Sequence, residues 1–372
     1  MTEARSGTST ALSEQEILDR TRDLAARLAG AVLPRGGSGA YAEAGSETLH
    51  DYFRDSGLLA LSIPATFGGT GAGWPTVYRV IRILAQAGLE SASAQAFARH
   101  HLQLAAIQLS GSALQQRRLL TATVAQQWFW GEGVNPGGRQ VVASIHPNGF
   151  ILDGDLALEP PGADWLMVSA WDPGTQSVVT GALASSESGV DFQPGSNIAH
   201  LSSVLLAHEQ VLQRPGQAIT AQATLRALVA QLASANLHLG EGLRVFDAAL
   251  RQARIGAASA DDGELQLGFG ELKLLLHPAE VLADHAAVEL ERAFRKGVLV
   301  NARERGELAI AVAEAECLAQ RAVGEVRRRV PEWNGQHPGV ARTGPVNDAF
   351  DGKLRDLGRH ALDGSLPEPA VY

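Results

Sequence analysis

The stretch of sequence that decides the fold runs from Asp55 to Pro75 and reads D-S-G-L-L-A-L-S-I-P-A-T-F-G-G-T-G-A-G-W-P. Gly57 predicts the end of a helix, and a short apolar run then reaches Pro64. The glycines that follow adopt positive φ at little cost and the prolines fix φ, so the chain is expected to form a tight, structured turn here. Helical spacing lies on both sides of it, which places the turn between two helices.

The composition is that of an ordinary globular protein. The chain has 372 residues, 45% of them hydrophobic and 19% charged, which is enough for two or three domains with a large core. A net charge of −9 gives no electrostatic support for nucleic-acid binding. Cys317 is the only cysteine, so an intrachain disulfide is excluded and a reducing, cytoplasmic location is expected. Neither a membrane span nor a signal peptide is predicted, because no apolar run is long enough.

The hydrophobic period divides the chain into segments. Residues 1–12 are small and polar and are expected to be disordered. Helical spacing dominates residues 13–125, short apolar runs separated by Gly, Pro and Asn predict a small β-domain over residues 126–215, and helical spacing returns over residues 216–372. Pro278 lies inside the last helical pattern and predicts a kink or a break. The sequence therefore predicts a mainly α fold with a small β-domain in the middle.

Two apolar stripes of the C-terminal segment predict self-association. Leu225–Leu239 and Leu308–Leu318 offer more apolar helix face than one domain obviously needs. We therefore expect a homo-oligomer, either a dimer or a tetramer, although a thick core is the rival explanation of the same stripes.

Several short motifs follow the turn in order along the chain. They are His100-His101-Leu102, Trp128-Phe129-Trp130-Gly131, Arg254-Ile255-Gly256, Gly268-Phe269-Gly270-Glu271-Leu272 and the run from Lys353 to His360. In this order and spacing, over nearly the whole chain after residue 45, they resemble acyl-CoA dehydrogenase-fold flavoproteins. The resemblance is strongest to the reduced-flavin-dependent monooxygenase branch typified by dibenzothiophene monooxygenase.

The resemblance carries expectations about architecture and activity. It implies an N-terminal α-helical domain, a middle β-barrel and a C-terminal four-helix bundle, assembled into a tetramer built from dimers. It also implies a flavin, FAD or FMN, where the three domains meet, and a small-molecule substrate. In the monooxygenase branch, reduced flavin comes from a separate flavin reductase.

The resemblance also implies roles for individual residues. The His-Leu motif of the branch lies beside the reactive face of the flavin, so His101 is the catalytic candidate. His100 is expected to point about 100° away on an ideal helix, so that both histidines cannot face one site. Asn347 is expected to line the pocket, and the expected cofactor-binding residues are Trp130, Glu132, Arg254 and Arg342.

The sequence departs from the family pattern near the expected cofactor. Glu132 stands where the family has a small polar residue, and its carboxylate would repel a phosphate or reduced flavin. Pro160 occupies the approximate position of a flavin-bonding hydroxyl, and proline has no donor. Gly344 and Asn347 stand where the branch has histidines. We therefore expect flavin binding to be weak or even absent.

Three functions remain open on these grounds. The first is a flavin-dependent oxidoreductase, as a two-component monooxygenase. The second is an acyl-CoA dehydrogenase that desaturates a thioester, and the third is a non-catalytic family member that has lost tight flavin binding. No metal motif is present, because the eleven histidines are dispersed.

Each candidate residue also has an ordinary structural explanation. His101 can be a helix histidine satisfied by a backbone group, and Trp130 can belong to the core of the β-domain. Arg254 can be a cation that compensates the helix dipole before Gly256. Cys317, on a Leu-Ala helix face, is expected to be a buried thiol.

Overall fold

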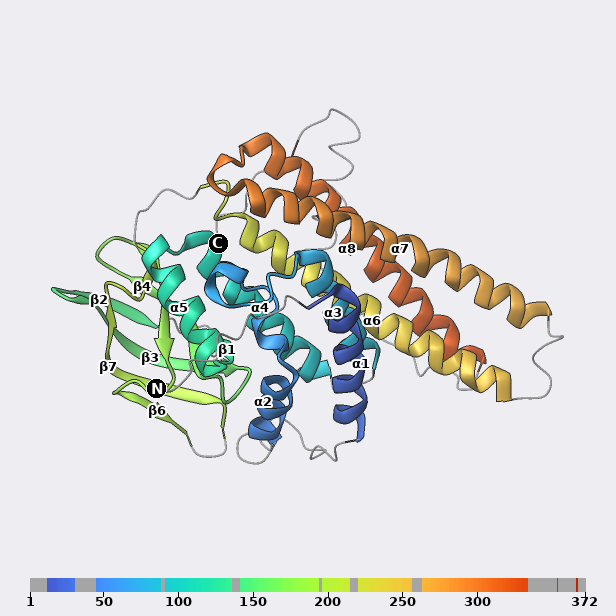
Figure 1. Ribbon diagram of the computed structural model, residues 1–372, viewed down its shortest axis with the longest axis horizontal. Coiled ribbons are helices and arrows are strands. Elements are labelled where there is room, and N and C mark those ends of the chain that lie inside the picture. Colours follow the sequence, from blue (N-terminus) through green and yellow to red (C-terminus); the bar gives the residue numbers. More distant parts are fainter. Residues whose placement is uncertain are drawn as a thin grey trace, which may run out of the picture. The chain divides into compact units, whose positions relative to one another are not determined.

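The chain folds into two compact units in a computed structural model (Figure 1). The first unit comprises Met1–Leu24, Val32–Val77 and Arg99–Gln217, and the second comprises Ala25–Ala31, Tyr78–Ala98 and Ala218–Tyr372. The three domain boundaries that the sequence predicts remain a prediction. The structure describes residues 12–30, 45–87, 91–135, 141–193, 196–214, 220–255, 263–333, 353 and 366.

The stretch from Asp55 to Pro75 forms the predicted turn between two helices. Helix α2 (Gly45–Ser56) stops at Gly57, whose φ is 71°, and α3 (Trp74–Gln86) begins at the end of the stretch. Between them lie two single 3₁₀ turns, η2 (Leu58–Ala60) and η3 (Ala65–Phe67). The amide of Thr70 donates to the carbonyl of Ala60 at 3.2 Å, so the loop folds back on η2. The apolar side chains of the run are buried: Leu58, Leu59, Leu61 and Ile63.

Two further helices of the N-terminal half each begin with a capping box. Helix α1 (Glu14–Gly30) follows Ser13, whose Oγ accepts the amide of Glu16 while the Glu16 carboxylate accepts the amide of Ser13. Helix α5 (Ala113–Gln126) has the same capping box from Ser112 and Gln115. Helix α4 (Ser91–Ser110) lies between α3 and α5 in the chain.

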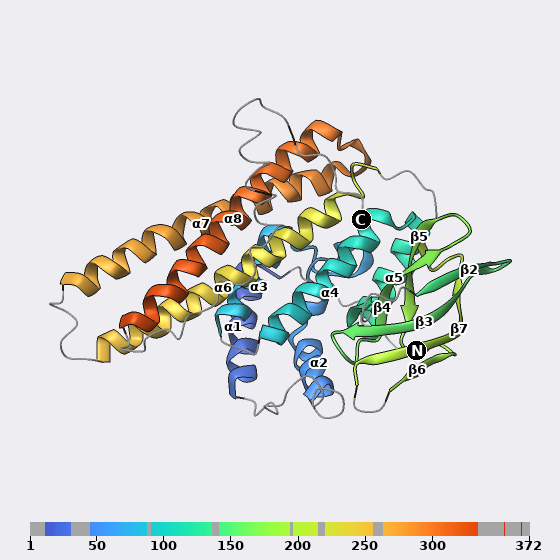
Figure 2. The same ribbon diagram turned by 180° about the vertical axis from the view of Figure 1, so that it is seen from behind.

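One sheet of eight strands occupies the middle of the sequence, within the predicted β-segment (Figure 2). The strand order is β6-β7-β3-β1-β4-β5-β8, and β2 pairs with β3 and β4. Neighbours run antiparallel except that β1 and β2 each run parallel to β4. The strands are β1 (Trp130–Val134), β2 (Val142–His146), β3 (Gly149–Glu159), β4 (Trp165–Asp172), β5 (Ser177–Ala184), β6 (Val190–Phe192), β7 (Ile198–Ala207) and β8 (Val211–Gln213).

The core of the first unit lies where α4 and α5 pack against this sheet. Leu104 and Ile107 of α4 and Leu119 and Leu120 of α5 are buried in one cluster with strand residues. The strand residues of that cluster are Trp130, Trp165, Met167, Ala182 and Leu212.

The second unit is built on three long helices, α6 (Leu225–Ile255), α7 (Gly263–Lys296) and α8 (Ala302–Trp333), which lie side by side in both views (Figures 1 and 2). A short 3₁₀ turn, η5 (Gly297–Leu299), joins α7 to α8. The fourth helix of the expected bundle falls outside the described residues except for Lys353, whose ammonium pairs with the buried Glu316 carboxylate.

The two apolar stripes that predict self-association are core in this unit. The hydrophobic residues of the first are buried, including Leu225, Leu232 and Leu239, and those of the second include the buried Leu308 and Val312. The thick-core explanation therefore accounts for these stripes, and the oligomeric state stays a prediction.

A buried arginine joins α3 to the long helices. Arg82 is 8% exposed and donates to the Asn236 side chain at 2.7 Å and to Asp284 at 2.7 Å. Its charge is thus matched inside the second unit, as a buried cation requires.

Of the kink or break predicted at Pro278, the break does not occur. Helix α7 is continuous from Gly263 to Lys296 through this residue. Pro278 and Leu274 are both exposed, so the ring lies on the solvent side and the Leu274 carbonyl, which loses its helical donor, can be hydrated.

We predict that Gly69→Ala destabilises the protein by about 1–3 kcal/mol, the usual cost of forcing atoms into a packed site. An added Cβ would lie 2.5 Å from the Cβ of Ile63 and closer still to its carbonyl oxygen, and Ile63 is buried. Gly324→Ala is the matched control, because nothing lies within 4 Å of an added Cβ there. Alanine in that helix should stabilise by up to about 1 kcal/mol. Chemical denaturation measures the free energy of unfolding of both variants. Equal changes in the two variants would contradict the packing argument.

Candidate functional site

Three consecutive residues of α4, Arg99, His100 and His101, reach three different parts of the first unit. His100 is fully buried, and its Nε2 lies 2.8 Å from the carbonyl oxygen of Leu59 while its Nδ1 lies 3.0 Å from the amide nitrogen of Trp130. A carbonyl only accepts and an amide only donates, so the ring carries its proton on Nε2 and is neutral. Burial lowers the pKa of His100 to about 4, which agrees with this tautomer.

His101, the predicted catalytic residue, lies in the same buried region. Its side chain is 1% exposed, and its Nδ1 lies 2.8 Å from the Oγ of Ser62. Burial holds the pKa of His101 well below its usual value, and the neighbouring His100 contributes in the same direction. The ring is therefore neutral at physiological pH and can act as a hydrogen-bonding group, not as a cationic acid.

The expectation that His100 and His101 cannot face one site stays a prediction, although the two rings are in contact. Their rings meet edge to face with centroids 4.9 Å apart. The side chains do leave the helix in different directions, but the turn between Leu59 and Ser62 supplies a hydrogen-bond partner to each of them.

A third histidine lies against the same cluster. The ring of His50 stacks on Phe129 at a centroid distance of 4.4 Å, and Phe129 lies 5.1 Å from the His100 ring. Burial lowers the pKa of His50 to about 4, with the Arg54 cation acting in the same direction. Asp164 accepts the amide of Phe129 at 2.6 Å, and both of its carboxylate oxygens accept from Nη2 of Arg54, so the chain entering β1 is fixed by an ion pair.

Trp130, a predicted cofactor-binding residue, is part of the core. It has no exposed surface, its Nε1 donates to the Oγ1 of Thr123 at 2.8 Å, and its ring packs against Trp165 at 5.5 Å. The ring is thus already enclosed within the first unit, and its backbone amide is held by His100.

Glu132, the other predicted cofactor-binding residue on β1, belongs to an ionic cluster with Arg99 and Glu159. Glu132 and Glu159 are directly opposite each other on β1 and β3, an arrangement of like charges that is unfavourable by itself. The Arg99 guanidinium lies between them, 3.7 Å from the Glu132 carboxylate and paired also with Glu159. All three side chains are about one-third exposed, and their charges sum to −1.

Sequence reasoning did not single out Arg99, Glu159 or Ser62. The only available signal for Arg99 was its position next to the His-His motif. Glu159 and Ser62 became visible only through strand register and the course of the turn, which depend on the tertiary structure.

The remaining predicted site residues are not placed by the structure. Arg254 lies in the last turn of α6, and its side chain is outside the described part of the chain. Asn347 and Arg342 also lie outside the described residues. His101, Trp130 and Glu132 are therefore the predicted site residues that can be compared with the geometry.

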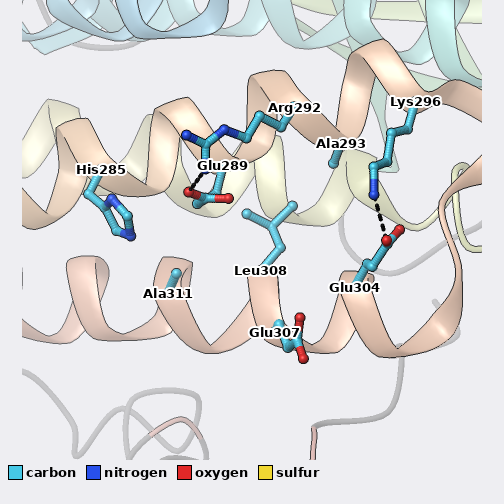
Figure 3. A pocket seen from close by; sticks show the side chains of 9 residues that line it. All are labelled: His285, Glu289, Arg292, Ala293, Lys296, Glu304, Glu307, Leu308 and Ala311. Atoms are coloured by element: carbon cyan, nitrogen blue, oxygen red, sulfur yellow. Dashed lines mark hydrogen bonds and ion pairs between the residues drawn. The ribbon is translucent and has the colours of Figure 1, made fainter.

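A cavity of ≈ 370 Å³ lies between α7 and α8 in the second unit (Figure 3). Two pairs of its charged groups lie within the wall: Lys296 lies 2.5 Å from Glu304, and Arg292 pairs with Glu289. The remaining carboxylate, Glu307, pairs with Arg303 at 2.9 Å. Leu308 projects between the two pairs in Figure 3. Because these cations are matched within the wall, the cavity does not present an unopposed charge to a ligand.

The described residues offer neither a metal site nor a membrane-spanning helix. Within the ranges that the structure describes, no three His, Cys, Asp or Glu side chains are placed to hold one metal ion. No helix in those ranges combines the length and the apolar composition needed to cross a bilayer. Cys317 is buried there, and burial raises the pKa of its thiol.

Comparisons with a family model and with known proteins indicate the same family. The family model described as acyl-CoA dehydrogenase, N-terminal domain, matches residues 13–127. The chain is 30% identical, over 94% of its length and 96% of the relative's, to a probable FMNH2-dependent monooxygenase, SfnC, of Pseudomonas putida. It is 27% identical to a dibenzothiophene monooxygenase of Rhodococcus erythropolis, over 94% of this chain and 93% of that one.

A solved structure extends the comparison to three dimensions. The complex of TdsC from Paenibacillus sp. A11-2 with FMN and indole matches with a TM-score of 0.82 and 25% sequence identity. The match covers 96% of this chain and 99% of that one. The similarity therefore extends over both units of the chain.

We predict that the protein loses stability as the pH falls from about 6.5 toward 4, because unfolded histidines have pKa values near 6.5. His50 and His100, with pKa values lowered to about 4, stay neutral in the folded protein over this range while the unfolded chain takes up protons. The loss should be on the order of several kcal/mol in total. Thermal unfolding across this pH range measures it.

The control for this prediction is His50→Phe, which keeps a ring stacked on Phe129 and removes one titrating group. The variant should show a shallower dependence of melting temperature on pH than the wild type. If the melting temperature of the variant depended on pH as steeply as that of the wild type, His50 would not contribute to the loss of stability at low pH.

Proposed function

Because the chain belongs to the acyl-CoA dehydrogenase superfamily, within its branch of reduced-flavin-dependent monooxygenases, we propose that it is the oxygenase component of a two-component monooxygenase. In this proposal a separate reductase supplies reduced flavin, and the protein oxygenates a small molecule. The observation that carries the proposal is the 30% identity to an FMNH2-dependent relative over 94% of the chain. We propose FMN as the cofactor, which is supported by the name of SfnC, a probable FMNH2-dependent monooxygenase, and by the complex of TdsC with FMN.

The half-exposed side chains where β1 and the end of β3 pair fit one part of a flavin better than another. The cluster of Arg99, Glu132 and Glu159 has a net charge of −1, which suits an uncharged ring and opposes a phosphate or a negatively charged reduced ring. Trp130 and His101 are enclosed and offer no exposed ring face. Flavin binding should therefore be weak, and we expect the protein to purify colourless.

The proposed roles of the site residues follow from this arrangement. His101 acts as a neutral hydrogen-bonding group toward the reacting atoms, and Ser62 orients its ring. Glu132 forms the β1 side of the cofactor site and Arg99 balances its charge, while the enclosed Trp130 supports the same strand from the core. Asn347 lines the pocket, and Arg254 and Arg342 bind the phosphate of the cofactor. We further propose a cytoplasmic homo-oligomer, where the reductase and a reducing environment are both available.

The charge of the site favours one alternative function, a non-catalytic family member that no longer binds flavin tightly. The observation in its favour is that Glu132, an expected cofactor-binding residue, lies opposite a second carboxylate, Glu159. The alternatives differ in a simple test, because the oxygenase must bind reduced flavin and consume oxygen.

We predict that Glu132→Gln tightens FMN binding by about tenfold, which corresponds to about 1.4 kcal/mol. The change removes one of two negative charges and leaves Arg99 to balance Glu159. Titration of the visible absorption spectrum measures the dissociation constant. Glu209→Gln is the matched control, because Glu209 pairs with Arg118 at 3.6 Å elsewhere in the same unit.

Two results would weigh against the charge argument. The argument that the charge of Glu132 weakens FMN binding would be wrong if Glu132→Gln left the dissociation constant unchanged. It would also be wrong if Glu209→Gln tightened FMN binding equally. A wild-type protein that binds neither FMN nor reduced FMN at millimolar concentration would favour the non-catalytic alternative.

We predict that His101→Ala lowers turnover by about 10²-fold, the effect typical of losing a positioned proton-transfer or hydrogen-bonding group. The assay supplies reduced FMN and oxygen and measures peroxide release and oxygenation of indole or dibenzothiophene. Ser62→Ala, which deletes only the partner of Nδ1, should lower turnover much less.

Because His101 is buried, its replacement also affects stability, so turnover is compared per folded molecule. If both variants lose activity only in proportion to the unfolded fraction, His101 is a packing residue and the catalytic assignment is wrong.

A further inference from the structure

Three of the six tryptophans of the chain touch one another in a row within the first unit. The ring of Trp130 packs against Trp165 with centroids 5.5 Å apart, and Trp165 packs against Trp128 with centroids 4.9 Å apart. Both distances are those of aromatic rings in direct contact. We call these three residues the tryptophan row.

The tryptophan row runs from the interior toward the surface. Trp130 has no exposed surface and Trp165 is 9% exposed, whereas Trp128 is only partly buried. The inner end lies close to the proposed cofactor site, because Glu132 follows Trp130 by two residues on β1, about 7 Å along the strand. The row therefore connects the proposed site with solvent through rings in contact.

Packing alone does not require an indole at each of these positions. The cluster that surrounds Trp130 and Trp165 is made of hydrophobic residues, such as Leu104 and Leu119, against which a phenylalanine ring would also pack. An indole brings an N–H group that needs a partner in the core, which Thr123 supplies to Trp130. An indole also gives up one electron far more readily than a phenylalanine ring or an aliphatic side chain. This second property is the one that a row of three tryptophans can use.

The surroundings of Trp130 favour movement of positive charge along the row. Its Nε1 donates to the Oγ1 of Thr123 at 2.8 Å, and that hydroxyl donates to the carbonyl of Leu119 at 2.7 Å. A hydroxyl and a carbonyl are not bases that remove a proton, so an oxidised Trp130 keeps its positive charge. A charge in an apolar interior is unfavourable, and it is more stable at Trp128, where water reaches the ring.

We propose that the tryptophan row is an electron-transfer path that carries oxidising equivalents from the cofactor side of β1 to the surface. The oxidant is a peroxide-derived radical, such as the hydroxyl radical, formed when oxygen reduction does not reach the substrate. One electron passes from Trp130 to this radical, one from Trp165 to Trp130, and one from Trp128 to Trp165.

A soluble thiol completes the reaction at the surface. It returns one electron to Trp128 and releases one proton, which the reduced hydroxyl radical takes up to become water. The thiol becomes a thiyl radical, and two of these radicals combine as a disulfide. All three tryptophans are restored, so the row protects the interior without being consumed.

The protective purpose rests on the proposed function, whereas the path itself does not. The tests therefore use no flavin. Glu132→Cys carries a ruthenium polypyridyl label, which becomes a one-electron oxidant on illumination with a soluble electron acceptor. Cys317, the only native cysteine, is buried, so labelling is directed to residue 132. Failure of the path and failure of the oxygenase activity are thus distinguishable.

The first test is whether the row carries charge to its outer end. Mass spectrometry of the illuminated, labelled protein should find oxygenated tryptophan at Trp128. Trp165→Phe keeps a ring in the core but interrupts the row, so the products at Trp128 should be lost and products should appear at Trp130. Trp171→Phe is the matched control, since Trp171 is a partly buried tryptophan on the same strand as Trp165, and it should leave the products at Trp128 unchanged.

Melting temperatures show that the variants of the first test are folded. Products at Trp128 that persist in Trp165→Phe would mean that the label oxidises Trp128 directly, and would overturn the proposal. A labelled protein without oxygenated Trp128 would overturn it as well.

The second test is whether a thiol at the surface protects the interior. Reduced glutathione should suppress oxygenation of all three tryptophans in the labelled protein with an intact row, because it returns the electron at Trp128. In Trp165→Phe it should not suppress the products at Trp130, which is fully buried and no longer connected to the surface. Equal protection of Trp130 in both proteins, or protection in neither, would overturn the proposed role.

Discussion

The imidazole of His100 holds three parts of the first unit together, and the candidate site depends on it. One neutral ring donates to the Leu59 carbonyl and accepts the Trp130 amide, so it satisfies a buried acceptor and a buried donor at once. Either group left without a partner away from water would cost about 1–3 kcal/mol. The start of β1 is thereby fixed against α4. As a result Arg99, one residue before the histidine, and Glu132, two residues after the tryptophan, meet beside β1.

Much of the fold could be predicted because it follows from local rules. Gly57 has the positive φ that stops α2, and the change of hydrophobic period near residue 126 marks the passage from helices to strands. These signals act over a few residues and need no knowledge of the tertiary structure. Pro278 shows where a local rule fails: proline removes one helical hydrogen bond, but on the solvent side water replaces it and the helix continues. The order of segments, and the similarity to flavin-dependent monooxygenases, therefore came from the sequence.

The candidate site could be predicted only in part, because its contacts join distant parts of the chain. The sequence drew attention to His101, Trp130 and Glu132 through a resemblance, yet it could not show that the first two are enclosed. Inside the protein these two side chains form hydrogen bonds with Ser62 and Thr123, which lie elsewhere in the sequence. The surroundings of Glu132 depend on the pairing of β1 with β3, because their register places Glu132 opposite Glu159. A likeness of motifs thus located the region, and packing decided which of its side chains reach the surface.

The ionic cluster of Arg99, Glu132 and Glu159 has a consequence for how this protein can change over evolutionary time. Loss of the arginine alone would leave two carboxylates facing each other across neighbouring strands. Loss of one glutamate alone would alter the net charge at the edge where the cofactor is proposed to lie. Single substitutions here therefore affect folding or ligand binding, whereas a paired exchange can avoid both effects. Relatives of this chain should consequently vary at these three positions together. The amino acid at position 99 should therefore correlate with the amino acids at positions 132 and 159.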